Sequence, residues 1–283
     1  MIAELIPDKL TQGTIFSCAR SDIYPGPVHG LIITARCDVA HGKNDSYAFL
    51  PIIALHDWAM LDGALITARR TASASIAVLE DILDKSELAK SILDKISHAD
   101  IGRLLKEKAG KDAKKRFEKF EANATYLARC NAALTNRDRP SLEKILKDHP
   151  QIFKGVYKDL HSNAMSDFHF LPRLTASAPS EGYVLSLREV RHLSRNAARK
   201  VEEGFDSTQL ATLETAERET DKQLCFSPEA DFAMPISQVR SPETELIMQR
   251  FTQLFSRIGV DDLSKDDIDT ARDNLATILE IRL

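Results

Sequence analysis

A cysteine, an aspartate and a histidine lie close together at Cys37, Asp38 and His41. Catalytic cysteines use a neighbouring histidine because it favours the thiolate, which is the nucleophilic form. The cluster follows an apolar run that begins at Gly30 and is typical of a buried strand. The residues therefore also fit a structural interpretation, in which Cys37 is a small buried residue and Asp38 hydrogen-bonds the turn. We favour this structural interpretation, and catalysis by the cluster is the alternative.

The same region offers ligands of the kind that zinc prefers. Cys18, Cys37 and His41 are the candidate metal ligands, with His29 nearby in the sequence. However, the four cysteines of the chain form no close CxxC pair, which is the spacing that usually begins such a site. We therefore expect no metal. A second group of titratable residues, interpreted as surface or hydrogen-bonded side chains, comprises His161, Asp167 and His169.

Two basic segments could contact phosphates. Residues 103–119 contain eight Lys and Arg against three Asp and Glu, and residues 188–200 contain a second run of arginines. Clustered basic side chains supply the salt-dependent part of nucleic-acid binding. No aromatic residues alternate with them for base stacking, so we favour the interpretation as solvated surfaces, and nucleic-acid contact is the alternative. The candidate nucleic-acid-binding residues are Lys111, Lys114, Lys115, Arg188, Arg191, Arg195 and Arg199.

The overall composition is that of an ordinary globular protein. The 283 residues are 43% hydrophobic and 28% charged, with a net charge of -4, so general attraction to nucleic acid or anionic membranes is not expected. No apolar run approaches the roughly 18 residues of a membrane span, and no secretory signal is recognised. Motifs for nucleotide hydrolysis, dinucleotide binding, zinc proteolysis and α/β-hydrolase chemistry are absent. We expect a cytoplasmic protein without a cofactor, and we lean toward a protein that is not an enzyme.

The elements that must position these residues change type along the chain. Residues 13–55 form short runs rich in β-branched and aromatic residues between turn residues, which predicts three strands, with Pro51 at an edge or a bulge. From His56, apolar residues recur at helical spacing, and Asp57 can cap the first helix. Strand patterns return as a hairpin over 167–194 and a last strand over 231–239.

These patterns predict an α+β fold with a small SH3-like or PemK-like β-barrel or sheet built from both ends of the chain. The expected domains are a discontinuous β-barrel or sheet domain of residues 1–55 plus 163–240, and a helical insertion of residues 56–162. Residues 241–283 are expected to form C-terminal helices that pack on the barrel. A capping box at Ser264 predicts the second of these helices. Separate β and α domains are the alternative.

Residues 13–55 resemble the opening of the PemK/MazF-type toxins, which are small SH3-like barrels that cleave RNA. The matching segments are Gly13–Phe16, Pro27–Gly30, Leu31–Thr34 and Phe49–Ile53. At the family's functional positions the chain has Thr14 in place of Asp, His29-Gly30 in place of Arg-Pro, and Ile52-Ile53 in place of Thr or Ser. The resemblance thus implies the barrel but not the nuclease activity.

The Cys37-Asp38 step also resembles uncharacterised bacterial proteins encoded in mobile or defence-type gene clusters. This resemblance implies a component of a multi-protein system. Our first hypothesis is a non-enzymatic interaction or regulatory protein, with a protein partner that is encoded in the same operon. A nucleic-acid-binding protein with a degenerate PemK-like barrel is the alternative, and a cysteine and histidine enzyme or metal site is a minor one. The oligomeric state is left open.

Overall fold

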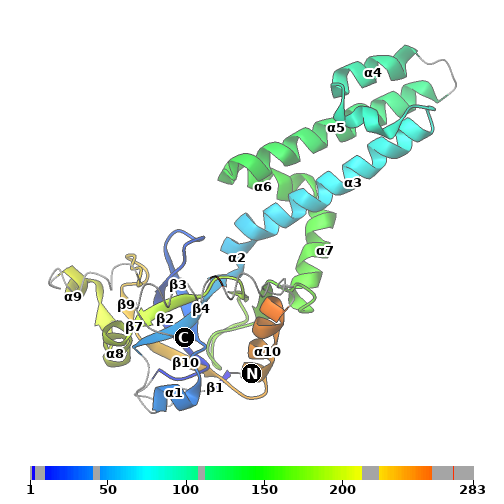
Figure 1. Ribbon diagram of the computed structural model, residues 1–283. Coiled ribbons are helices and arrows are strands. Elements are labelled where there is room, and N and C mark those ends of the chain that lie inside the picture. Colours follow the sequence, from blue (N-terminus) through cyan, green and yellow to red (C-terminus); the bar gives the residue numbers. More distant parts are fainter. Residues whose placement is uncertain are drawn as a thin grey trace.

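The computed structural model describes residues 2–3, 10–40, 45–107, 112–211, 223–256 and 270. An antiparallel sheet curls into a half-barrel, and an arm of helices projects away from it (Figure 1). The prediction of a mixed fold, with strands from both sides of a helical segment, is confirmed at this level. In the described part of the chain, no helix is long and apolar enough to cross a membrane.

The sheet has the strand order β1-β10-β2-β3-β4-β6-β5, and β7 also pairs with β4. An early and a late part of the chain meet in this sheet. Strand β10 lies between β1 and β2 and pairs antiparallel with both. The strands are β1 (Ile2–Ala3), β2 (Thr14–Arg20), β3 (Pro27–Ile32), β4 (Ser46–Ala54), β5 (Phe168–Leu171), β6 (Tyr183–Ser186), β7 (Arg191–Ser194) and β10 (Pro235–Val239). The predicted hairpin is present as the antiparallel pair β5 and β6.

Pro51 lies in a central strand and pairs with β3 without a shift of register, so the prediction of an edge or a bulge is wrong. On one side of β4, Pro51 pairs with Gly30 of β3. On the other side, residues 46–49 pair with β7 and residues 52–54 pair with β6. Pro51 therefore falls where β4 changes partners, a position in which a residue without an N–H group costs the sheet no hydrogen bond.

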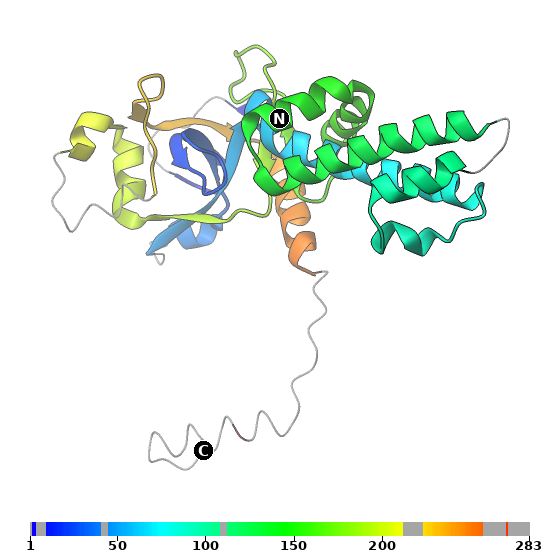
Figure 2. The same cartoon turned by 90° about the horizontal axis from the view of Figure 1, so that it is seen from above.

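The arm is a helical segment that leaves the sheet at the end of β4 and returns before β5 (Figures 1 and 2). Its helix begins at Leu55 without a side-chain cap, so the predicted capping by Asp57 is wrong. The elements are α2 (Leu55–Trp58), the π-helical turn η1 (Ala59–Gly63), α3 (Ala64–Asp84), the 3-10 helix η2 (Lys90–Asp94), α4 (His98–Glu107), α5 (Ala113–Asn136), α6 (Arg139–Asp148) and α7 (Pro150–His161).

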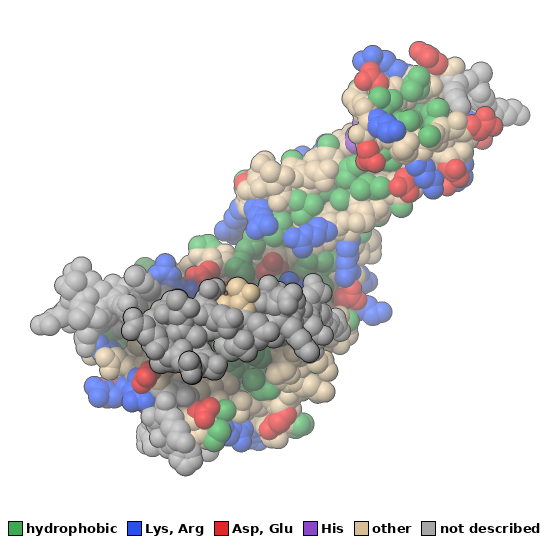
Figure 3. Space-filling view, in the orientation of Figure 1, with side chains coloured by type: hydrophobic (Ala, Val, Ile, Leu, Met, Phe, Trp, Pro, Cys, Tyr) green, Lys and Arg blue, Asp and Glu red, His purple; other side chains and the backbone are tan. Residues whose placement is uncertain are grey.

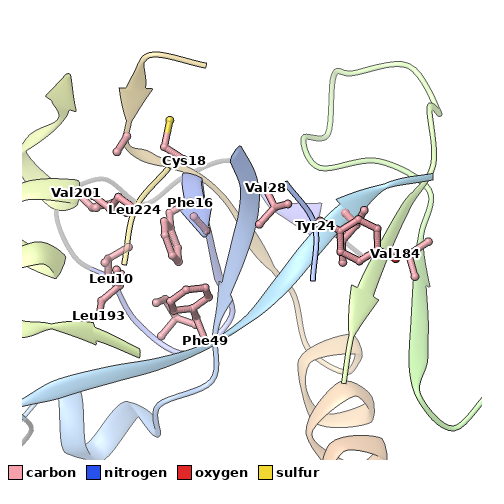
Figure 4. Packing of buried hydrophobic residues seen from close by; sticks show 14 of the residues in the cluster. Leu10, Phe16, Cys18, Tyr24, Val28, Phe49, Val184, Leu193, Val201 and Leu224 are labelled. Atoms are coloured by element: carbon pink, nitrogen blue, oxygen red, sulfur yellow. The ribbon is translucent and has the colours of Figure 1, made fainter. Parts of the chain in front are cut away.

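Three apolar cores hold these elements. One covers one face of the sheet, where the rings of Phe16 and Phe49 meet edge to face with centroids 5.1 Å apart (Figure 4). Gly30 permits this contact, because a Cβ atom there would lie 2.3 Å from the Phe16 ring. The second core lies within the arm, and the third covers the other face of the sheet, where Ile247 of α10 packs.

The half-barrel region contains further helices and short strands. They are α1 (Arg36–Ala40), α8 (Arg195–Glu203), β8 (Phe205–Asp206), α9 (Ser207–Ala211), β9 (Phe232–Ala233) and α10 (Glu243–Ser256). The last predicted strand is thus present as β9 and β10. The second C-terminal helix, predicted from Ser264, lies outside the described residues apart from residue 270.

A buried polar network attaches α10 to the sheet. Arg250 donates to the backbone oxygens of Asn163, Met165 and Phe168, and to His169 Nδ1 at 2.8 Å. Because Nδ1 accepts, the proton of this histidine is on Nε2, which lies 2.8 Å from Glu243 Oε1. Burial and the nearby guanidinium lower the pKa of His169. The prediction that His169 is a hydrogen-bonded side chain is confirmed, and its bonds join β5 to the distant helix α10.

Candidate functional site

The Cys37 cluster does not form a buried strand end. Strand β3 ends at Ile32, and Cys37 lies on the short helix α1, where its side chain is exposed. Its Sγ atom lies 3.7 Å from Asp38 Oδ1. The structural interpretation of Cys37 as a buried residue is therefore wrong. His41 lies outside the described residues.

The metal candidates lie in different environments. Cys18 is buried in β2, and burial raises the pKa of its thiol to about 11. His29 is in β3 with its ring against Tyr183, and burial lowers its pKa to about 4. Within the described residues, no group of three or more His, Cys, Asp or Glu side chains could hold a metal ion.

The four candidate arginines of the half-barrel each have a carboxylate partner. The pairs are Arg188 with Asp167 at 2.7 Å, Arg191 with Asp22, Arg195 with Asp45 at 3.6 Å, and Arg199 with Glu203 at 3.5 Å. A neighbouring carboxylate offsets much of the positive potential that would attract a phosphate. These arginines therefore carry less free charge than their number in the sequence indicates.

The candidate lysines lie elsewhere. Lys114 and Lys115 are in the first turn of α5, at the end of the arm that is far from the sheet (Figure 1). Lys111 lies outside the described residues. On the face shown in Figure 3, both basic and acidic side chains lie on the far end of the arm. The structure thus does not bring the two predicted basic groups together on one surface.

A pocket of about 270 Å³ lies where the half-barrel meets the arm. One wall comes from the half-barrel, through the loop after β2 and the end of β4, and the other comes from α2, η1 and the corner between α5 and α6. The lining residues are Tyr24, Pro25, Pro27, Val28, Ile53, Asp57, Met60, Leu61, Arg137, Arg139 and Leu142. Its size is near the lower limit of small-molecule sites, and its lining surface is about equally polar and apolar.

Two arginines provide the positive charge of this pocket. Arg137 ends α5 in a left-handed conformation with φ of 53°, and Arg139 begins α6. No hydrogen bond or ion pair of either guanidinium group is present within the described residues, although Arg137 interacts electrostatically with Asp62 and Arg139 with Glu143. Asp138 between them accepts a hydrogen bond from the backbone N–H of Ser141 at 3.0 Å, which fixes the corner. Both guanidinium groups are therefore available to a ligand.

Tyr24 connects the pocket to a buried carboxylate. Its hydroxyl donates to Asp62 of η1, and burial raises the pKa of both groups. The donation from Tyr24 and the charges of Arg69 and Arg137 partly offset this rise for Asp62. The hydrogen bond joins the loop of the half-barrel directly to the base of the arm.

The loop that carries Tyr24 is held in place by residues of the β6–β7 connection. Glu189 is almost fully buried and accepts hydrogen bonds from the Ser21 hydroxyl at 2.8 Å and the Asp22 backbone N–H at 2.5 Å. The Ser21 oxygen in turn accepts from the backbone N–H of Tyr24 at 3.1 Å. Arg191, a predicted nucleic-acid contact, pairs with Asp22 of this loop. Its position therefore supports a role in fixing the loop.

Sequence reasoning missed this pocket because its walls are far apart in the chain. The segment from Tyr24 to Pro27 indicated only a turn, and Arg137 and Arg139 were outside both basic runs. One local signal was present in the sequence. Asp138 followed by Arg139 and Pro140 is typical of a helix start, so Arg137 and Arg139 are expected at a corner between two helices. Because Arg137 and Arg139 line the pocket, the arrangement can bind and orient an anion.

Comparisons with known proteins add no assignment. No protein-family model, no curated protein and no solved structure matches the chain. The functional argument therefore comes from the residues and their geometry.

Proposed function

We propose that this protein is a non-enzymatic interaction component of a bacterial multi-protein system, and that it recognises an anionic group of a protein partner in the pocket between half-barrel and arm. The observation that carries the proposal is the pair of arginines, Arg137 and Arg139, in a pocket that is also lined by apolar side chains. The bacterial context rests on the resemblance of the Cys37-Asp38 region. The resemblance of residues 13–55 to PemK/MazF proteins supports a related small barrel as the scaffold.

The chemistry of the lining favours a carboxylate or phosphate attached to an apolar body. A guanidinium is always charged and binds both groups through two parallel hydrogen bonds. Val28, Ile53 and Leu142 offer apolar surface in the same pocket. Asp57 is the one carboxylate that lines the pocket, and it already pairs with His56 at 3.2 Å.

A protein partner fits this pocket better than a nucleic acid does. The pocket accommodates one side chain or one short segment rather than a backbone of repeated phosphates. The arginines of the half-barrel are paired with carboxylates, and the lysines of α5 are at the far end of the arm. A continuous basic groove, which single strands require, is therefore not formed by the predicted residues.

The location of the pocket also supports a regulatory role. Tyr24 and Ile53 belong to the half-barrel, whereas Met60 and Arg139 belong to the arm. A ligand that contacts both walls stabilises the arrangement of half-barrel and arm in which the two walls lie close together. Partner binding would thus restrict the motion of the arm relative to the half-barrel.

The test uses three probes that share one apolar body. Phenyl phosphate and phenylacetate carry a negative charge, and phenethylamine carries a positive charge. Calorimetry should show binding of the two anions, with an affinity that falls as the salt concentration rises, and no binding of phenethylamine. Equal binding of all three probes would exclude the role of the arginines.

Two variants test the residues themselves. Arg137→Asn keeps a residue that tolerates the left-handed conformation, and Arg139→Gln keeps the length of the side chain. The double variant should lose at least tenfold in anion affinity. Arg103→Gln on α4, which removes an arginine paired with Asp100, should bind normally. A short single-stranded oligonucleotide is the further probe. If it binds the wild type more tightly than phenyl phosphate and loses affinity in the double variant, the partner is a nucleic acid and not a protein.

A further inference from the structure

Two cysteines from distant parts of the chain lie opposite each other in the backbone register of a short antiparallel contact. Ala19, at the end of β2, forms an isolated antiparallel bridge with Leu224. In an antiparallel pair, the residues next to a bridge are also opposite each other. The residue before Ala19 is Cys18 and the residue after Leu224 is Cys225, and the Cys225 backbone N–H donates to the Cys18 oxygen at 2.9 Å.

The backbone hydrogen bond brings the two cysteines into the range of a disulfide, although Cys18 departs from regular strand geometry with a φ of 57°. Opposed residues of antiparallel strands have Cα atoms about 4.5 to 5.5 Å apart, and disulfides join Cα atoms about 4.4 to 6.8 Å apart. The electrostatic effect of Cys225 on the Cys18 thiol is a second sign that the two groups are close. Cys37 is exposed on α1 and Cys130 is buried in the core of the arm, so each lies in a different element.

The two thiols differ in access to solvent. Cys18 is 2% exposed, and its Sγ atom lies 3.3 Å from the Ala230 oxygen. Cys225 is partly exposed. Its flanking residue Leu224 is buried beside Cys18 in the core shown in Figure 4, so the segment is anchored there. A reagent in solution therefore reaches Cys225 first, and Cys18 is the thiol that can act second.

We propose that Cys18 and Cys225 form a reversible disulfide by exchange with a small-molecule disulfide. The Cys225 thiolate attacks one sulfur of the reagent, forms a mixed disulfide and releases one thiolate. Cys18 then loses its proton to water and attacks the Cys225 sulfur, which forms the protein disulfide and releases the second thiolate. Two protein thiols are oxidised, and one external disulfide is reduced to two thiols.

The bond would join β2 to the segment just before β9, at a point where one isolated bridge makes the backbone contact. It would close a loop that contains the whole arm and most of the sheet. Long loops are those in which a cross-link most restricts the unfolded chain. Oxidation is therefore expected to raise the unfolding temperature of the half-barrel. This modification is independent of the pocket and of the function proposed for it.

The experiment uses the folded 283-residue chain carrying Cys37→Ser, which removes the exposed thiol. The protein is incubated with glutathione disulfide at graded ratios to glutathione, blocked with an alkylating reagent, digested and analysed by mass spectrometry without reduction. We expect a cross-linked peptide pair containing Cys18 and Cys225, reversible by excess glutathione. Glutathione that remains bound at Cys225 while Cys18 is alkylated after denaturation would overturn the proposal.

Two further variants separate the roles of the thiols. In the same background, Cys18→Ser should accumulate one stable glutathione at Cys225, whereas Cys225→Ser should accumulate neither the adduct nor the cross-link. Cys130→Ser is the matched control and should form the cross-link as before. A cross-link that persists in Cys225→Ser, through another cysteine, would contradict the assignment. If Cys18→Ser does not fold, the peptide pair in the parent protein still decides.

Discussion

The two large parts of the molecule reach their cores by different routes. All buried members of the arm core come from one continuous segment, from Ala64 to Ile145. The core on one face of the half-barrel instead combines residues as distant as Leu10 and Ala233. Helices that meet after short connections can pack while the rest of the chain is unfolded, whereas this sheet requires strands from both ends of the chain. We therefore expect the arm to open locally and the half-barrel to unfold as a unit.

Removing one aromatic ring from each core should test this difference most strongly. Phe120→Ala in the arm and Phe49→Ala in the half-barrel each remove a fully buried ring, at a cost of about 3 to 5 kcal/mol. In Phe120→Ala, hydrogen exchange should accelerate over residues 64–145 and remain slow in the sheet. In Phe49→Ala, it should accelerate throughout the sheet. Equal acceleration in both regions by Phe120→Ala would show that the two parts unfold together.

Adding one carbon atom tests how closely the sheet is packed. Gly30→Ala would place a Cβ atom within 2.4 Å of two atoms of the Phe16 ring, so we expect a loss of about 2 to 3 kcal/mol in urea unfolding. Gly155→Ala on α7 is the matched control, because its Cβ would meet only the Arg70 side chain at 4.0 Å. There the change should be neutral or stabilise by up to about 1 kcal/mol. A tolerated Gly30→Ala would contradict the close contact of Phe16 with the backbone.

The same conservative substitution should have different effects in the two parts. Arg250→Lys removes the planar group that donates to several backbone oxygens at once, so we expect a loss of about 2 kcal/mol. Arg103→Lys on the arm affects one exposed ion pair and should cost less than about 0.5 kcal/mol. Urea unfolding of both variants beside the wild type measures the difference. Equal losses would mean that the network around Arg250 adds little to the attachment of α10.

His29 and His169 predict how acid affects the half-barrel. Burial lowers the pKa of His29 to about 4, and burial with the nearby Arg250 lowers that of His169. The unfolded state, with a histidine pKa near 6.5, then binds more protons, so the stabilisation is present above about pH 6.5 and is lost as pH falls toward the folded pKa. We expect about 1 to 2 kcal/mol less stability at pH 5 than at pH 7.5 from His29. Replacing it by Gln should flatten the urea-unfolding profile over this range, and an unchanged profile would contradict the assignment.

The predictions from sequence succeeded where structure depends on near neighbours. The apolar spacing that indicated helices after His56 and the paired strand patterns around Phe170 are both present in the structure. They failed where a distant partner decided the outcome. Pro51 is central because β6 and β7 share one side of β4, and Cys37 is exposed because the chain turns into α1 after β3 ends. Local pattern does not specify either arrangement.

The sequence by itself determined the mixed architecture, the helical segment between strand regions and the absence of common catalytic motifs, because these follow from residue type and short-range spacing. Only the tertiary structure decided which charged groups are free. It pairs Arg191 with Asp22, leaves Arg137 and Arg139 in the lining of one pocket, and places Cys18 opposite Cys225. These contacts depend on the register of the strands and on the corners between helices. Register in turn depends on the packing of the whole sheet rather than on any one segment.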